Sequence, residues 1–457
     1  MKAVKQFFCL VVLVLGFGFT GGVIANNLQV SNVALSGTLL SFNVSWDNSW
    51  RTMSTAPYNY DAVWLFVKYR DCGSLQWNHA HVDSAGAASP LFADTTAEQT
   101  GVMIYRAGDG VGNISNVNVT LRLIGIPPGN YDFNVFGIEM VYVPQDSFYL
   151  GDGSSTYTWR EGTNVAQPYY INSESAITVA NSGTNLYAAA QIVAGTIPAP
   201  YPKGYRAFYC MKYEISQEQY VDYLNTLTST QDAARYQVSV ANRYTVGGTW
   251  PIHTATAGNR AMNWMSWDDL LTYLDWAALR PMTELEFEKA CRGKSIYVPD
   301  EYVWGTTFIV DANTPTNDGT PTESVSNPIP PGNGIANYGN NTLLGPLRTG
   351  FAGSGTTNRL QLGATYYGIC EMSGNIWEYV ITAGNVTGRA FLPTNGDGSI
   401  TPVGLWNVPG WVTAASAGIR GGGWSAAVAD LRISDRSLAI YTTTIRANNQ
   451  GGRGCRF

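Results

Sequence analysis

Apolar and polar positions alternate along the first part of the chain. Between Leu39 and Trp46 every second residue is large and apolar, with Ser or Asn in between. A period of two is typical of an antiparallel strand with one buried face. Similar runs, separated by Gly, Pro and Asn turns, predict strands at residues 28–35, 39–46, 62–69, 101–106, 115–123 and 131–136. Since no helical period interrupts them, we expect a β-sandwich in this part of the chain.

The pattern changes at Ile138, after which helix signals appear. Ser216 precedes a run with apolar residues at helical spacing, and Gln219 completes a capping box three positions later. Ser266 and Thr283 begin two further predicted helices in the same way. Little periodicity remains elsewhere, which predicts long loops at residues 167–204, 313–359 and 385–418.

The sequence thus predicts a short leader followed by two regions, the first with strand alternation and the second with helix signals and long loops. The fold class we expect is α+β, an all-β sandwich followed by a loop-rich domain. The expected boundaries are 1–25 for a signal peptide, 26–137 for the sandwich and 138–457 for the second domain.

Composition narrows the class of protein. Lys and Arg number 27 against 33 Asp and Glu, which gives a net charge of −6, and only 13% of residues are charged. A nucleic-acid-binding protein would need a basic face, so we expect no nucleic-acid partner. Hydrophobic residues make up 45% of the chain and aromatic residues 12%, which is enough for a packed core. A neutral, polar, loop-rich surface is typical of an extracellular protein.

The N-terminus supports export. Lys2 and Lys5 precede an apolar run from Phe7 to Phe19, and small residues before Asn26 suit cleavage. No later stretch reaches the ~18 consecutive apolar residues that a membrane span needs. We therefore expect a secreted or cell-surface protein with no membrane span.

Cysteine usage excludes a disulfide scaffold. Cys9 would leave with the signal peptide, and an odd number of widely spaced cysteines would remain, which permits two disulfides at most. These are Cys72, Cys210, Cys291, Cys370 and Cys455.

Ordered motifs after Ile138 carry a family resemblance. They run from the strand at 140–144 through the segments at 213–216, 263–269, 280–293 and 303–305. The most specific are Gly368-Ile369-Cys370-Glu371-Met372-Ser373-Gly374-Asn375-Ile376-Trp377-Glu378 and Arg420-Gly421-Gly422-Gly423-Trp424. Residues 138–457 thereby resemble the formylglycine-generating enzymes, the sulfatase-modifying factor family. The resemblance implies a C-type-lectin-like fold.

Catalysis in that family depends on two cysteines that bind copper. The family motif places them at Ala426 and Leu431 of this chain, so both thiols are missing. A histidine-bound iron, as in a related branch, is also not expected, because only His253 of the three histidines lies in this domain. The resemblance thus implies no catalytic residue, no copper and a domain that has lost its enzymatic activity.

The resemblance also implies structural calcium. Ca²⁺ prefers carboxylate and carbonyl oxygens, and the family positions fall on the side chains of Glu371 and Glu378 and the carbonyls of Gly374 and Ile376. A second, weaker site would use Asn337. The alternative is that Glu371 and Glu378 only cap and pair locally.

The C-terminal segment, residues 420–457, is the expected binding surface. In catalytic relatives it lines the substrate pocket. It also resembles the variable segment of secreted proteins that retroelements diversify, because Tyr, Thr, Ser and Asn alternate with scaffold residues. The alternative is a polar surface loop without such a role. The expected ligand contacts are Trp424, Ser425, Asp430, Arg432, Asp435, Arg436, Tyr441, Arg446 and Asn448.

Two other clusters of ionisable residues are not expected to form functional sites. His79 and His81 share one face of a strand, but two ligands are too few for a metal site, and we expect that face to be exposed. Glu284, Glu286 and Glu288 lie on a capped helix and are expected to be solvated.

Together these features predict a secreted ligand-binding protein with an inactive enzyme-like domain and an extracellular protein or glycan as partner. One alternative is a metal-dependent oxidoreductase of the same family. The other is a self-assembling subunit of an extracellular filament or surface layer.

Overall fold

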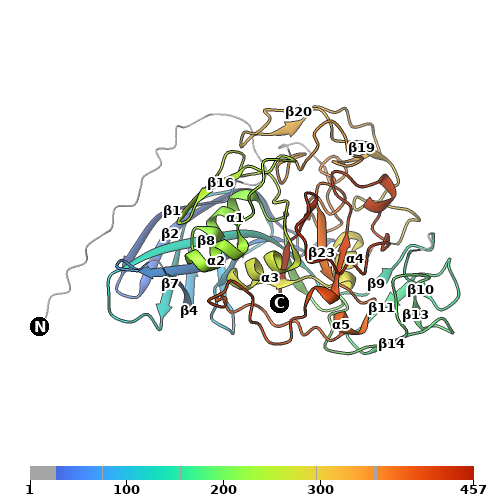
Figure 1. The fold of residues 1–457 in the computed structure, drawn as a ribbon, viewed down its shortest axis with the longest axis horizontal. Helices are drawn as coiled ribbons and strands as arrows, with labels where there is room; N and C mark the ends of the chain where they lie inside the picture. The colour runs from blue at the N-terminus through green and yellow to red at the C-terminus, as the bar shows by residue number, and fades with distance from the viewer. Residues whose placement is uncertain (1–26, 75, 155–156, 295, 354–357) are drawn as a thin grey trace, which may run out of the picture.

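The computed structural model describes residues 27–74, 76–154, 157–294, 296–353 and 358–457. The predicted signal peptide at 1–25 lies outside these residues. In Figure 1 the N-terminal strands lie at the left and the C-terminal third at the right, with helices α1 and α3 between them. Among the described residues, no helix combines the length and the hydropathy needed to traverse a bilayer.

The N-terminal third folds into strands, as the alternation predicts. Each of the six predicted strands is present, the strand expected around His79 and His81 is β4, and β5 was not predicted. The strands are β1 (Gln29–Ser36), β2 (Leu39–Arg51), β3 (Asp61–Asp71), β4 (Trp77–Ala87), β5 (Leu91–Thr95), β6 (Val102–Arg106), β7 (Gly110–Ile124) and β8 (Tyr131–Val143).

These strands share one hydrophobic core. Strands β1, β2 and β7 pair in that order, and β7 pairs with the second half of β4, whose first half pairs with β3. The buried face of β2, from Leu40 to Trp46, packs against Val63, Leu65 and Val67 of β3 in one hydrophobic cluster. The prediction that β2 buries one face is therefore confirmed, since every second residue from Leu40 to Trp46 is buried.

Strand β3 is buried on both faces. Its other face carries Trp64 and Phe66, which belong to the large core of the rest of the chain. The indole N–H of Trp64 donates to the carbonyl of Ala277 at 2.8 Å, and the guanidinium of Arg456 lies 4.2 Å from its ring centroid. One strand thus serves two cores.

The same sheet continues into the second part of the chain. Strand β8 pairs along β3 from Tyr131 to Val141 and also with β15 (Phe208–Met211). Beyond β15 follow β26 (Gly454–Arg456) and β18 (Arg280–Pro281), so the C-terminal strand β26 joins an 11-stranded antiparallel sheet between β15 and its edge strand β18. The predicted boundary at 137/138 falls inside β8, and the division into domains stays a prediction.

The three predicted helices are confirmed, with their capping boxes. The hydroxyl of Ser216 accepts from the backbone of Gln219, and Ser266 and Thr283 cap their helices in the same way. Helix α2 also has a capping box, formed by Thr228 and Gln231, and was not predicted. The helices are α1 (Gln217–Leu224), α2 (Ser229–Arg235), α3 (Trp267–Trp276), α4 (Glu284–Arg292) and α5 (Val386–Arg389).

The remaining elements are short and separated by loops, so the fold is β-rich around one large antiparallel sheet. The short elements are β9 (Phe148–Leu150), β10 (Arg160–Glu161), β11 (Tyr169–Ile171), β12 (Ile177–Val179), β13 (Leu186–Tyr187), β14 (Gly195–Ile197), β16 (Val246–Thr249), β17 (Ile252–Ala255), β19 (Ile309–Asp311), β20 (Pro315–Thr316), β21 (Ser324–Val325), β22 (Gly334–Ala336), β23 (Trp377–Ile381), η1 (Ala414–Ser416), β24 (Ala417–Arg420), η2 (Val428–Leu431) and β25 (Gln450–Gly451).

Candidate functional site

The two positions that would carry the family's copper cysteines lie next to each other. A methyl group placed on Gly422 would meet the Leu431 Cδ1 atom at 2.6 Å and the Ala426 Cβ atom at 3.4 Å. Both side chains are buried in the main core. A methyl and an isobutyl group have no atom that can bind copper. Across the described ranges, no group of three or more His, Cys, Asp or Glu side chains is placed to hold a metal ion.

Trp424, two residues before Ala426, anchors the start of the C-terminal segment. Its ring packs with Ala261 and Ile376, and its indole N–H donates to the carbonyl of Asn448 at 3.1 Å. The next residue, Ser425, accepts from the amide of Asn449 at 2.9 Å. The two ends of the segment therefore lie side by side. Trp424 is only 3% exposed, so we no longer place it among the predicted ligand contacts. Its packing and its hydrogen bond hold the C-terminal segment in place.

Arg446 fixes the loop at residues 441–449. Its guanidinium donates to both carboxylate oxygens of Asp269 at 2.6 and 2.8 Å. Asp269 belongs to the capping box of α3 and also pairs with Arg235 at 3.0 Å. At the two ends of the loop, the backbone N–H of Tyr441 donates to Ala417, and Asn448 donates to Asn242. The backbone is thus tied down at several points.

Between these anchors the loop presents side chains to solvent. Thr442, Thr444 and Ile445 are exposed, and Ile445 is 70% exposed. Tyr441 is half-buried. Sequence reasoning placed ligand contacts at the anchors and missed these three residues, although they stand between the residues it chose.

A second polar group lies around η2. Asp430 accepts from the backbone of Ala427 at 3.1 Å, and burial, followed by the charge of Asp435, raises the pKa of its carboxyl. Arg432 pairs with Asp300 at 2.9 Å, with side chains 32% and 40% exposed. Asp430, Arg432 and Asp435 are all half-buried and remain reachable from solvent.

Arg436 does not reach the surface, which corrects its predicted ligand role. Its guanidinium donates to Glu284 at 2.8 Å and lies 3.8 Å from the ring centroid of Trp159. Arg420 bridges Glu284 and Glu288 at 3.0 and 2.8 Å. All four charged side chains have 0% exposure.

The prediction that the acidic face of α4 is solvated is therefore wrong. Glu284, Glu286 and Glu288 are each fully buried. Glu286 pairs with Arg280 at 2.7 Å, and the other two carboxylates pair with Arg420. Arg280 and Arg292 lie near in the sequence, but Arg420 and Arg436 come more than 130 residues later, so the helix sequence by itself does not reveal the burial of Glu284 and Glu288.

The predicted exposure of the His79 face is also wrong for His79 itself. His79 is buried, with Nε2 2.7 Å from the carbonyl of Thr100 and Nδ1 3.0 Å from Nζ of Lys68. His81 is exposed. The two rings therefore do not share one environment. His79 stacks on Phe66, with ring centroids 6.0 Å apart, at the edge of the large core.

The predicted calcium ligands have unequal surroundings. Glu371 is buried, and its Oε1 accepts from the backbone of Gly350 at 3.0 Å, while Oε2 has no hydrogen-bond partner among the residues that the structure describes. Burial raises the pKa of Glu371 to about 7. An unpartnered buried carboxylate oxygen is costly, and a cation would relieve that cost. Glu371 thus fits the ligand role.

Glu378 fits that role poorly. Both of its oxygens accept from the guanidinium of Arg453, at 2.8 and 2.7 Å. The carbonyl of Gly374 accepts from the backbone of Ile376 at 2.9 Å. Asn337 donates to the carbonyl of Gly345 at 3.0 Å. An internal guanidinium stands where the resemblance implied a metal ion.

Glu214 completes this motif and was not predicted as a site residue. Its carboxylate accepts from the side chain of Asn375 at 2.6 Å and from the backbone of Ile376 at 3.0 Å. Burial, followed by the charge of Glu371, raises the pKa of Glu214 well above its usual range. Its position in the 213–216 motif was the available signal.

Comparison with known proteins identifies the domain. The model of the sulfatase-modifying factor enzyme 1-like domain matches residues 139–456, and no curated protein matches the chain significantly. Among solved structures, the chain resembles Treponema denticola variable protein 1, with 14% identity, a TM-score of 0.32 and coverage of 70% of this chain and 95% of that one. It also resembles CarF, with 15% identity, a TM-score of 0.27 and coverage of 69% and 98%. Because the family model spans more than half of the chain, the protein belongs to the sulfatase-modifying factor enzyme 1-like family.

Proposed function

We propose that this protein is a secreted or surface ligand-binding protein whose enzyme-like domain has no copper chemistry. The observation that carries the proposal is that Ala426 and Leu431 are buried apolar side chains that both lie against Gly422. The family motif places the copper-binding cysteines at these two positions. Without soft ligands there, a copper ion would have nothing to hold it at that place.

The binding surface we propose is the exposed part of the C-terminal segment. It comprises the exposed Thr442, Thr444 and Ile445 and the half-buried Ser425 and Asn448. The anchors fix the backbone before a ligand arrives, so little conformational entropy is lost on binding. Small hydroxyl and amide side chains beside an apolar one suit adaptable contacts with a protein or glycan.

Diversification of this segment by a retroelement fits the same anatomy. Buried anchors such as Trp424 and Leu431 would keep the scaffold constant, while exposed positions such as Thr442 and Thr444 tolerate change. A near-copy of the coding segment that differs only at adenines would support this idea. Identical sequences in independent isolates would contradict it.

The N-terminal strands are proposed to form a β-sandwich that acts as a spacer, an assembly surface or an anchor. Their separate hydrophobic core supports this role. Export is supported by the leader pattern in the sequence and by the low charge of 13%.

A ligand screen with a surface variant tests the binding proposal. The wild-type protein is screened on arrays of glycans and extracellular proteins, and each hit is measured again with Thr442, Thr444 and Ile445 replaced together by Ala. A matched control replaces Val238 and Val240, which are 75% and 99% exposed and lie outside the segment. We expect a loss of about tenfold or more for the first variant only. Unchanged affinity in the first variant would refute the site.

We further propose a structural calcium ion beside Glu371. Its buried, unpartnered Oε2 supports this, whereas the pairing of Glu378 with Arg453 limits the number of protein ligands. Calcium titration followed by thermal unfolding tests it, with Glu371→Gln as the matched variant.

A further inference from the structure

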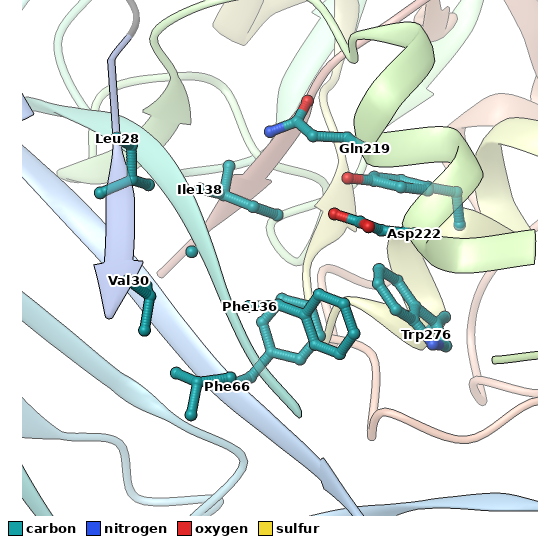
Figure 2. Close-up of a pocket in the computed structure, with 11 residues that line it drawn as sticks. Leu28, Val30, Phe66, Phe136, Ile138, Gln219, Asp222 and Trp276 are labelled. Carbon is teal, nitrogen blue, oxygen red and sulfur yellow. The ribbon is translucent and has the colours of Figure 1, made fainter. Parts of the chain in front are cut away.

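A cavity of about 250 Å³ lies between the N-terminal strands and the helices. It is lined by residues between Leu28 and Trp276, so the C-terminal segment contributes none of its lining residues. Strand β1 and the start of the chain contribute Leu28 and Val30, β3 contributes Phe66 and β8 contributes Phe136 and Ile138. Helices α1 and α3 close the other side (Figure 2). Its size suits a single side chain or a small organic ion.

Asp222 of α1 brings a carboxylate to this cavity. Figure 2 shows the carboxylate directed from the helix toward Ile138. No described residue forms an ion pair or a side-chain hydrogen bond with it. Burial raises the pKa of Asp222 to about 7, with a further contribution from Glu218 one turn earlier. Asp222 is half-buried, and a carboxylate that is largely removed from water without a partner costs free energy unless something supplies the missing charge.

Three aromatic rings face the same space. The ring centroids of Phe66 and Phe136 are 5.3 Å apart, and each lies 5.1 Å from that of Trp276. Aromatic faces carry negative potential and attract cations, most strongly where water is excluded. Nζ of Lys68 already lies 5.6 Å from the ring centroid of Phe66 and 5.1 Å from that of Trp276, so the rings show that they can pack against a cation, and Asp222 is the group that selects a positive charge in a ligand.

The scarcity of acceptors decides which cation fits. A primary ammonium has three N–H donors to satisfy. The ionisable or polar groups that line the cavity are Asp222, the Tyr273 hydroxyl and the Gln219 amide, and the Gln219 oxygen already accepts from the backbone of Ser216 at 3.0 Å. A fully methylated ammonium has no donor to satisfy and presents methyl groups that pack against rings.

We propose that this cavity binds a methylated ammonium group, with Asp222 as counter-ion and Phe66, Phe136 and Trp276 as the packing surface. The site is independent of the C-terminal segment and of the function proposed there. A neutral or anionic ligand would leave the charge of Asp222 uncompensated. The same chemistry occurs in free choline, in a phosphocholine headgroup and in trimethylated lysine.

The proposal has a pH signature. The groups that face Asp222 are Glu218 on α1 and Tyr273 on α3, and the lining residues from β1, β3 and β8 carry no ionisable group. A cation stabilises the charged carboxylate and so lowers its pKa in the complex. Binding then releases a proton below about pH 7, and affinity rises with pH up to that point. It stays constant above, because a quaternary ammonium does not titrate.

Choline and its uncharged isostere 3,3-dimethylbutan-1-ol provide the test, measured by NMR titration of the full chain at about pH 8. We expect choline to bind about tenfold or more tightly than the isostere. Asp222→Asn should remove that preference, and Glu218→Gln, which changes the exposed carboxylate one turn away, should change it by less than about threefold. Choline affinity should fall by about tenfold at pH 6 or below.

Several results would overturn the proposal. They are equal binding of choline and the isostere, no choline binding at about 20 mM, and unchanged choline preference in Asp222→Asn. Competition against bound choline then identifies the source of the group. A trimethyllysine peptide that competes indicates a protein ligand, dodecylphosphocholine indicates a headgroup, and competition by neither indicates the free ion.

Discussion

Replacing Arg436 with Ala separates a structural role from a ligand-binding one. The side chain donates to Glu284 at 2.8 Å and to the carbonyls of Ala190 and Gln191 at 2.8 and 2.9 Å. It has 0% exposure and stacks on Trp159. The substitution leaves a buried carboxylate short of one partner, leaves two carbonyls without donors and opens a cavity.

The size of the effect follows from these losses. Removing one partner from a buried ion pair costs about 3–5 kcal/mol, and each unsatisfied carbonyl adds about 1 kcal/mol. Glu284 keeps Arg420 at 3.0 Å, which lowers the first contribution. We therefore expect a loss of about 3–5 kcal/mol in the free energy of unfolding. Arg436→Lys keeps the charge without the planar fork and should lose less.

Arg432 supplies the matched control in the same segment. Its pair with Asp300 is partly exposed, so Arg432→Ala should cost about 0–1 kcal/mol. Urea unfolding followed by tryptophan fluorescence measures both variants. A loss below about 1 kcal/mol for Arg436→Ala, or equal losses for the two variants, would refute a structural role for Arg436.

Three further outcomes are expected. The pKa of Asp222 rises from 3.8 to about 7 in the folded state, so the folded protein binds this proton more tightly than the unfolded chain and loses stability as pH rises from about 4 to 7. Asp222→Asn should therefore be more stable than wild type by about 2–4 kcal/mol at pH 8 and equal to it near pH 4; a pH-independent difference in calorimetry would contradict this. Calcium should raise the melting temperature of wild type and not of Glu371→Gln, and equal shifts would exclude a site at Glu371. Ile445→Ser, at a position 70% exposed, should change stability by less than about 0.5 kcal/mol, and a larger loss would show that Ile445 packs against the scaffold.

Local patterns predicted the elements well because their causes are local. Alternation from Leu40 to Trp46 and the capping box at Ser216 depend on residues a few positions apart. The exposure of β4 was predicted wrongly at His79, because the burial pattern of the strand changes where its pairing passes from β3 to β7. Burial of both faces of β3 likewise depends on a layer contributed by residues far along the chain.

The site was predicted less well, since its geometry depends on long-range partners. The copper positions at 426 and 431 came from a motif and lie together as the motif implies. Arg436 and Arg446 look like surface residues in a polar segment, and their acidic partners Glu284 and Asp269 stand far earlier in the chain. The unpartnered carboxylate of Asp222 has no sequence signature, because only the surrounding strands make its position apolar.

Copper binding tests most directly whether the domain has lost its family's chemistry. The purified mature protein is incubated with Cu(I), dialysed and measured for metal content and for oxygen uptake with a cysteine-containing peptide. We expect less than about 0.1 copper per chain and no peptide-dependent oxygen uptake, whereas Ala426→Cys with Leu431→Cys should gain about one copper. One copper per wild-type chain, with oxygen consumed in the presence of the peptide, would contradict the assignment of this domain to ligand binding.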